Sequence, residues 1–102
     1  MVTLTVSTKS HEELVDITGQ VSRAVSDSGV KDGICLVYTP HTTAAITINE
    51  NADPSVRSDM IRGLRNLKME AVNFEHMEGN SPAHVKSSLI GCSESIPVAE
   101  GK

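Results

Sequence analysis

Aromatic residues are almost absent from this 102-residue sequence, which has one Tyr, one Phe and no Trp. Aromatic side chains bury the largest area per residue. The core must therefore be built from Val, Ile, Leu, Met and Ala, and we expect a neighbouring subunit to complete part of the hydrophobic surface. The length is enough for one compact domain, residues 1–102, and too short for two.

Clustered positive charge, paired cysteines and long apolar runs are missing as well. Nine basic against thirteen acidic residues give a net charge of −4, which argues against a nucleic-acid-binding surface. Cys35 and Cys92 form no C-x-x-C pair, which favours free thiols in a reducing compartment over a disulfide. With neither a signal-peptide pattern nor an apolar stretch long enough for a membrane span, the sequence predicts a cytoplasmic protein with no membrane and no nucleic-acid partner.

The hydrophobic periodicity predicts an α+β domain with the order β–α–β–β–α–(α)–β and with helices on one side of a sheet. Strands are expected at residues 2–7, 34–38, 43–48 and 93–98, the second of them fully buried. Helices are expected from an N-cap at Thr18 to Ser28–Gly29, from Asp53–Pro54 onward, and from Ser81–Pro82 to about Gly91. Residues 69–80 are predicted to form a loop, and Glu100–Gly101 to begin a turn.

Polar residues gather where these elements end. His41-Thr42-Thr43 lies at the break after the second strand, and Glu50-Asn51 closes the third. His76 falls inside the unpatterned loop, and Asn80-Ser81 with His84 leads into the last helix. Functional groups are commonly held on loops by a rigid framework, so this placement suggests a site.

The histidines His41, His76 and His84 are candidates for shared chemistry. Imidazole binds borderline divalent metals and transfers protons near neutral pH. Their spacing matches no standard ligand pair, so each could equally cap or bridge backbone groups at its own turn. His84 lies about one turn after Ser81, where the positive end of the helix dipole favours neutral imidazole. The same helix start, with Asn80 nearby, could hold a phosphate on free backbone N–H groups.

The other polar residues each have an ordinary structural alternative. Glu50 and Asn51 could contact a metal or a substrate amine, or could form a strand-to-helix connector with Asn51 fixing a turn. Asp59 is expected to pair with Arg62 at i+3. The two threonines after His41 could donate to an anion or simply favour a strand. No P-loop, nucleophile elbow or dinucleotide fingerprint is present.

Two long stretches, residues 28–60 with the motifs HTTA and NEN, and residues 75–98 with the motif GNSPAH, closely resemble the YjbQ-like (UPF0047) family. Asp16-Ile17-Thr18 also fits its pattern. The resemblance implies an α+β fold with a mixed, sandwich-like sheet. It also implies a homotrimer with sites near the subunit boundaries, which agrees with the ring-poor core.

The resemblance further implies a polar site and an associated activity, that of a thiamine-phosphate synthase. This reaction joins hydroxymethylpyrimidine pyrophosphate to a thiazole phosphate with loss of pyrophosphate. We expect catalytic roles for His41, Glu50, Asn51, Asp59 and His84, substrate-phosphate contacts from Thr42, Thr43, Asn80 and Ser81, and a divalent metal, zinc or magnesium, on His41, His76 and His84. Competing hypotheses are a non-catalytic metal- or phosphate-binding trimeric module and a metal-dependent hydrolase of a small phosphorylated compound.

The resemblance also implies a C-terminal region after the turn at Gly101, with a further strand, a tryptophan and arginines that suit phosphate. The sequence ends at Lys102. We therefore expect a YjbQ-like domain that lacks this region, with a sheet edge left unpaired.

Overall fold

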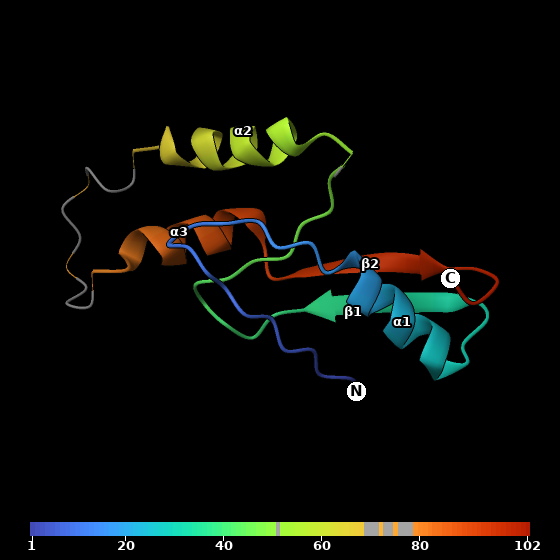
Figure 1. Cartoon of the computed structure of the whole chain (residues 1–102). Helices are drawn as coiled ribbons and strands as arrows, with labels where there is room; N and C mark the ends of the chain where they lie inside the picture. The colour runs from blue at the N-terminus through green and yellow to red at the C-terminus, as the bar shows by residue number, and fades with distance from the viewer. Residues whose placement is uncertain (51, 69–71, 73–74, 76–78) are drawn as a thin grey trace. The chain divides into compact units, whose positions relative to one another are not determined.

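The structure, a computed structural model, describes residues 1–50, 52–68, 72, 75 and 79–102. In these residues the order of elements is α1 (Thr18–Ser28), β1 (Gly33–Tyr38), α2 (Pro54–Arg65), α3 (Ser81–Ile90) and β2 (Ser93–Val98) (Figure 1). The chain divides into two compact units. The first unit comprises Met1–Val37 and Ser95–Lys102, and the second unit comprises Tyr38–Glu94.

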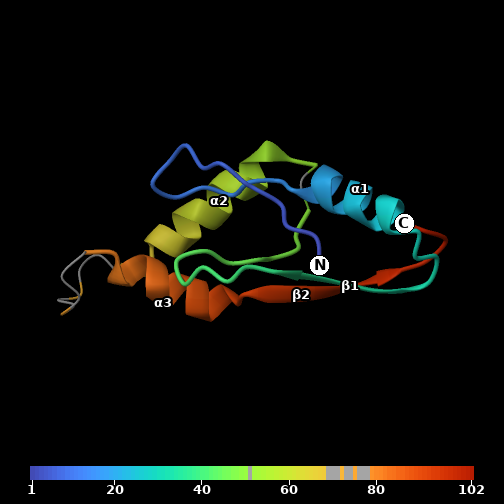
Figure 2. The same cartoon turned by 90° about the horizontal axis from the view of Figure 1, so that it is seen from below.

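The first unit is built on β1 and β2, which pair as a two-stranded antiparallel sheet. Helix α1 lies over one face of this sheet in both views (Figures 1 and 2). Val98 is 7 % exposed, and Cys35 and Val37 are half-buried. The predicted α+β class is therefore confirmed in the form of a small antiparallel sheet with helices.

The prediction that β1 is buried on both faces is wrong. Ile34, Leu36 and Tyr38 are 75 %, 64 % and 59 % exposed, and they alternate with the half-buried residues of the same strand. Successive side chains of a strand point to opposite faces. A helix on one face of the sheet therefore leaves every second apolar residue of β1 uncovered.

Helix α1 ends where the sequence predicts and begins one residue away from its expected cap. Gly29 has φ +76°, the left-handed conformation that glycine adopts readily at a helix C-terminus. The N-cap position is Ile17, without a side-chain cap, so the predicted Thr18 cap is wrong. The Thr18 N–H donates instead to Asp16 Oδ1 at 2.9 Å.

The predicted turn at Glu100–Gly101 is confirmed. The backbone N–H of Ala99 and that of Lys102 each donate to the other residue's carbonyl, at 3.2 and 3.1 Å. Glu100 and Gly101 both have positive φ, +56° and +78°, as in the type I′ turn that joins antiparallel strands. The Gly101 N–H donates to the Lys31 carbonyl at 3.0 Å, which fixes this turn beside the residues that lead into β1.

The second unit contains α2 and α3. Asp53 caps α2 by accepting from the Ser55 N–H at 2.9 Å, with Pro54 in the first turn, so the predicted helix start is confirmed. Helix α3 ends at Gly91 as expected, but its N-cap position is Asn80 rather than Ser81. The periodicity predicts an apolar stripe of Val56, Met60, Leu64 and Leu67. The first three are half-buried in α2, whereas Leu67 lies after the helix and is 49 % exposed.

The predicted strands at residues 2–7 and 43–48 are absent, since neither segment has strand structure. Alternating apolar residues make a segment suitable for a strand, but only a neighbouring backbone with matching N–H and C=O groups turns it into one. The second of these segments makes one such contact, from the Ile46 N–H to the Gly91 carbonyl at 3.1 Å. In the described part of the chain, no helix is long and apolar enough to cross a membrane. The single-domain organisation of residues 1–102 stays a prediction.

Candidate functional site

The segment that carries HTT is fastened to the end of α3 and the start of β2. Three hydrogen bonds make this connection, from the Thr39 N–H to the Cys92 carbonyl at 2.9 Å, from the Ile46 N–H to the Gly91 carbonyl at 3.1 Å, and from the Ser87 hydroxyl to the Ala44 carbonyl. The segment after β1 accordingly runs beside α3 within the second unit (Figures 1 and 2). The HTT turn and α3 therefore belong to one framework.

His41, Thr42 and Thr43 present their side chains to solvent. All three are exposed, and the two threonines form a turn rather than a strand. The His41 N–H donates to Thr39 Oγ1 at 3.3 Å, which holds the backbone at the beginning of this turn. The structural alternative for the threonines, that they favour a strand, is therefore wrong, and their hydroxyls are accessible to a ligand.

The first turn of α3 offers fewer backbone donors than the sequence suggests. The N–H groups of Ala83 and His84 both donate to the Asn80 carbonyl, at 3.1 and 3.3 Å, and Pro82 has no N–H. Among the first three helical residues only the Ser81 N–H has no hydrogen bond to another described residue. An anion at this helix start would therefore depend on side chains more than on the backbone.

Asn80 carries an unusual polar atom. Its Oδ1 is buried and has no hydrogen-bond partner among the described residues. A buried acceptor without a partner costs about 1–3 kcal/mol, so this oxygen is suited to an N–H or O–H donor or to a cation. His84, one turn further along, is half-buried, and its carbonyl accepts from the Ser88 hydroxyl at 3.0 Å.

Glu50 and Asp59 are exposed and take no part in this arrangement as the structure describes it. The Glu50 N–H donates to Asn49 Oδ1 at 2.7 Å. The expected ion pair of Asp59 with Arg62 does not form. The ion pair found in the described ranges is Arg23–Asp27, at 3.9 Å. Asn51 and His76 lie outside the described residues, so their predicted roles stay predictions.

The predicted metal site rests on His41, His76 and His84. The described residues contain no group of three or more His, Cys, Asp or Glu side chains that could hold a metal ion. His76 is outside this set, so the three-histidine site stays a prediction. Cys35 and Cys92 are free thiols, as the sequence predicts.

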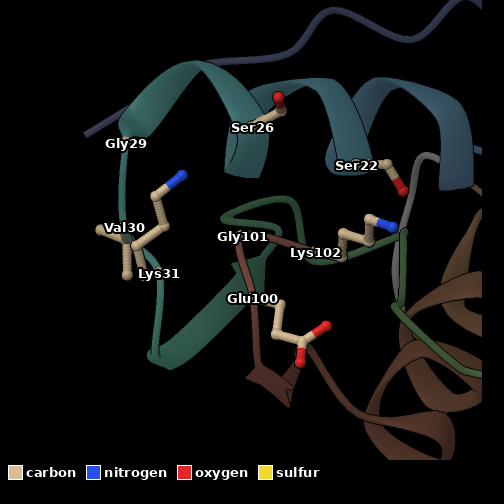
Figure 3. Close-up of a pocket in the computed structure, with 8 residues that line it drawn as sticks. All are labelled: Ser22, Ser26, Gly29, Val30, Lys31, Glu100, Gly101 and Lys102. Carbon is tan, nitrogen blue, oxygen red and sulfur yellow. The ribbon is translucent and has the colours of Figure 1, made fainter.

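One cavity lies in the first unit, apart from all of the predicted site residues. It has a volume of about 460 Å³ and is lined by Ser22, Ser26, Gly29, Val30, Lys31, Glu100, Gly101 and Lys102 (Figure 3). Sequence reasoning missed it because its two walls are far apart in the chain. Only the pairing of β1 with β2 brings them together.

Known proteins with similar sequences share one description. The family model described as UPF0047 protein YjbQ-like matches residues 2–102. The UPF0047 protein MJ1081 of Methanocaldococcus jannaschii is 58 % identical over 97 residues, which are 95 % of this chain and 70 % of that protein. The UPF0047 protein YugU of Bacillus subtilis is 45 % identical over 101 residues, 98 % of this chain and 76 % of that protein.

The fold has a close counterpart among solved structures. The crystal structure of an uncharacterized conserved protein of the YjbQ/UPF0047 family from Clostridium acetobutylicum superposes with a TM-score of 0.91 at 46 % identity. The match covers 95 % of this chain and 75 % of that one.

Proposed function

The chain belongs to the YjbQ-like UPF0047 family, and from this premise we propose that it is a transferase of the thiamine-phosphate synthase type. The proposed reaction joins hydroxymethylpyrimidine pyrophosphate to a thiazole phosphate. The thiazole nitrogen forms a bond to the pyrimidine methylene carbon, and the bond from that carbon to the pyrophosphate oxygen breaks. Pyrophosphate leaves with the bonding electrons.

The observation that carries this proposal is a buried acceptor, without a partner among the described residues, on the framework that also holds the HTT turn. Three hydrogen bonds tie the segment with His41 to α3 and to the two residues that follow it. The same helix begins at Asn80, whose Oδ1 has no partner among the described residues. A polar atom that is held rigidly and has no partner among the described residues is suited to bind a ligand without reorganising.

The departing pyrophosphate gains negative charge in the transition state, so donors that face it accelerate the reaction. We assign this role to the hydroxyls of Thr42, Thr43 and Ser81. His41 and His84 would donate protons or hydrogen bonds to the leaving oxygens. The Asn80 oxygen would accept a hydrogen bond from a substrate N–H group and so orient the pyrimidine. Glu50, Asn51 and Asp59 complete the proposed catalytic set.

The proposal includes an assembly and a metal. The exposed Ile34, Leu36 and Tyr38 support a homotrimer in which other copies cover this face of the sheet. In the proposed assembly the sheet becomes part of a sandwich-like sheet. Zinc or magnesium on the three predicted histidines would neutralise phosphate charge, and elemental analysis of the purified protein tests its presence. The proposed location of the protein is the cytoplasm.

The deciding experiment is a synthase assay. Purified protein is incubated with both precursors and with Mg²⁺ or Zn²⁺, and thiamine phosphate is measured by chromatography. We expect product from the wild type and a loss of about 10²-fold or more in His84→Ala, the scale of an acid–base contribution. His11→Ala is the matched control, because His11 is exposed in the first unit and should leave the rate unchanged.

Absence of product, or product formation that His84→Ala leaves intact, would contradict the catalytic assignment. Saturable pyrophosphate binding without product would favour the non-catalytic binding module. Release of phosphate from either precursor alone would favour the hydrolase.

A further inference from the structure

The cavity of the first unit has walls of fixed backbone. Its α1 side ends at Gly29, whose N–H donates to the Ser26 carbonyl at 3.3 Å. Its opposite side is the type I′ turn at Glu100–Gly101, which the Gly101 N–H holds to the Lys31 carbonyl. A Cβ added at Gly101 would lie 3.8 Å from the Lys31 side chain, so these two segments are in close contact. Hydrogen bonds therefore hold the backbone on both sides of the cavity.

The charges that line this cavity are of both signs and are not paired with one another. Lys31 and Lys102 contribute two ammonium groups, and Glu100 contributes one carboxylate. None of the three forms an ion pair with another described residue. The C-terminus of α1 adds a partial negative charge of about −0.5. The Lys31 side chain extends toward α1, the Lys102 amino group lies at the opposite end of the view, and the Glu100 carboxylate points away from α1 (Figure 3).

A ligand with a single charge fits this lining poorly. A plain anion would be attracted by the two ammonium groups but repelled by Glu100 and by the end of α1. A plain cation would be attracted by Glu100 and by the end of α1 but repelled by the two ammonium groups. A molecule with one anionic and one cationic end satisfies both, and the hydroxyls of Ser22 and Ser26 add donors and acceptors to its surroundings.

We propose that this cavity is a binding site for a small zwitterion that carries a carboxylate and an ammonium group, as an amino acid does. Lys31 binds the carboxylate, and Glu100 binds the ammonium. The volume of about 460 Å³ falls in the range of about 300–1,000 Å³ that is usual for small-molecule sites. The site is independent of the proposed synthase chemistry, whose residues lie in the second unit.

The test is a titration of the full chain followed by ¹H–¹⁵N NMR, with 4-aminobutyrate, butyrate and butylamine as probes. The last two are the anionic and cationic halves of the first. We expect 4-aminobutyrate to shift the amide resonances of Gly29, Lys31 and Gly101 saturably at millimolar concentration, and each half to bind at least about tenfold more weakly. Glycine and β-alanine, titrated in parallel, show which spacing of the two charges fits best.

Two substitutions test the two ends of the site separately. Lys31→Gln should weaken 4-aminobutyrate about tenfold and leave butylamine unaffected, while Glu100→Gln should weaken 4-aminobutyrate and leave butyrate unaffected or tighter. Arg23→Gln is the control, because Arg23 lies on α1 with an 85 % exposed side chain outside the cavity lining, and it should bind as the wild type does. Circular dichroism confirms that each variant is folded.

Three results would overturn the proposal. The first is the absence of saturable shifts with all three amino acids. The second is butyrate binding as tightly as 4-aminobutyrate, which would show a plain anion site. The third is unchanged zwitterion binding in folded Lys31→Gln.

Discussion

Ser87→Ala removes the contact that ties α3 to the segment after the HTT turn. The Ser87 hydroxyl donates to the Ala44 carbonyl, 43 residues away in sequence. The neighbouring Ser88 offers a matched control, since its hydroxyl donates to the His84 carbonyl within the same helix. Both substitutions exchange serine for alanine in the last turns of α3, so both gain the same helix propensity.

The difference between the two variants isolates the long-range hydrogen bond. A typical intramolecular hydrogen bond contributes about 0.5–1.5 kcal/mol net, whereas a serine bonded to its own helix contributes little or slightly destabilises it. The gain in helix propensity, roughly 0.5 kcal/mol, cancels in the comparison. Ser87→Ala should therefore be less stable than Ser88→Ala by about 1 kcal/mol, which corresponds to about 4–8 °C in Tm for a domain of this size.

Urea and thermal unfolding of both variants measure this difference, and amide hydrogen exchange shows where it arises. Exchange at Ile46 and Thr39 should become faster in Ser87→Ala and stay unchanged in Ser88→Ala, because these amides belong to the same connection. Equal stability of the two variants, within about 0.3 kcal/mol, would refute the argument. Faster exchange at Ile46 in both variants would refute it too.

Two further predictions concern the helix ends. Gly29→Ala should destabilise the protein by about 1 kcal/mol because alanine is strained at φ +76°, whereas Gly63→Ala, inside α2, should stabilise it by about the same amount. Neither new Cβ meets an atom within 4 Å, so urea unfolding that shifts both variants in one direction would contradict the backbone assignments. The Ser55 backbone N–H, and next its hydroxyl, lower the pKa of the Asp53 carboxyl. The capping contribution is therefore present above about pH 4, the unperturbed value, and is lost as the pH falls through the lowered pKa. Unfolding curves of wild type and Asp53→Ala should differ at pH 7 and converge at pH 2, and a difference that is constant with pH would contradict this cap.

Local signals allowed the helices and turns to be predicted well. Asp53–Pro54, Gly29 and Glu100–Gly101 each act through their own backbone conformation or a hydrogen bond within two residues. The first cap was misplaced by one position: the N-cap is Ile17, without a side-chain cap, and the Thr18 N–H donates to Asp16 Oδ1. At α3, Asn80 and Ser81 are both good caps, and the sequence does not distinguish them.

The strands were harder to predict because their partners are distant in sequence. Residues 43–48 alternate as a strand should, yet among the described residues only the Ile46 N–H finds a backbone partner outside the segment. Ile34 and Leu36 lie in a continuous apolar run, which predicts burial on both faces, but the sheet has a helix over only one. The local hydrophobic pattern indicates which side chains of a segment could be buried. Which of them are buried depends on the other elements that the fold places against the segment.

The candidate site was predicted in part for the same reason. The polar residues at element ends were identifiable because turns interrupt the apolar pattern, and His41 does lie on the framework of α3. The unpartnered Asn80 oxygen could not be predicted, since its burial depends on packing. The zwitterion cavity could not be predicted either, since only the sheet brings together the segments that carry Lys31 and Lys102.

The most direct test of the central claim is to locate where pyrophosphate binds. In a ¹H–¹⁵N NMR titration with inorganic pyrophosphate, the account predicts saturable shifts at Ser81, Ala83 and His84 and at the HTT turn. The amide resonances of Gly29 and Gly101, which line the first-unit cavity, should not shift. Shifts confined to that cavity, or no saturable shifts at the start of α3, would contradict the proposed phosphate-binding site.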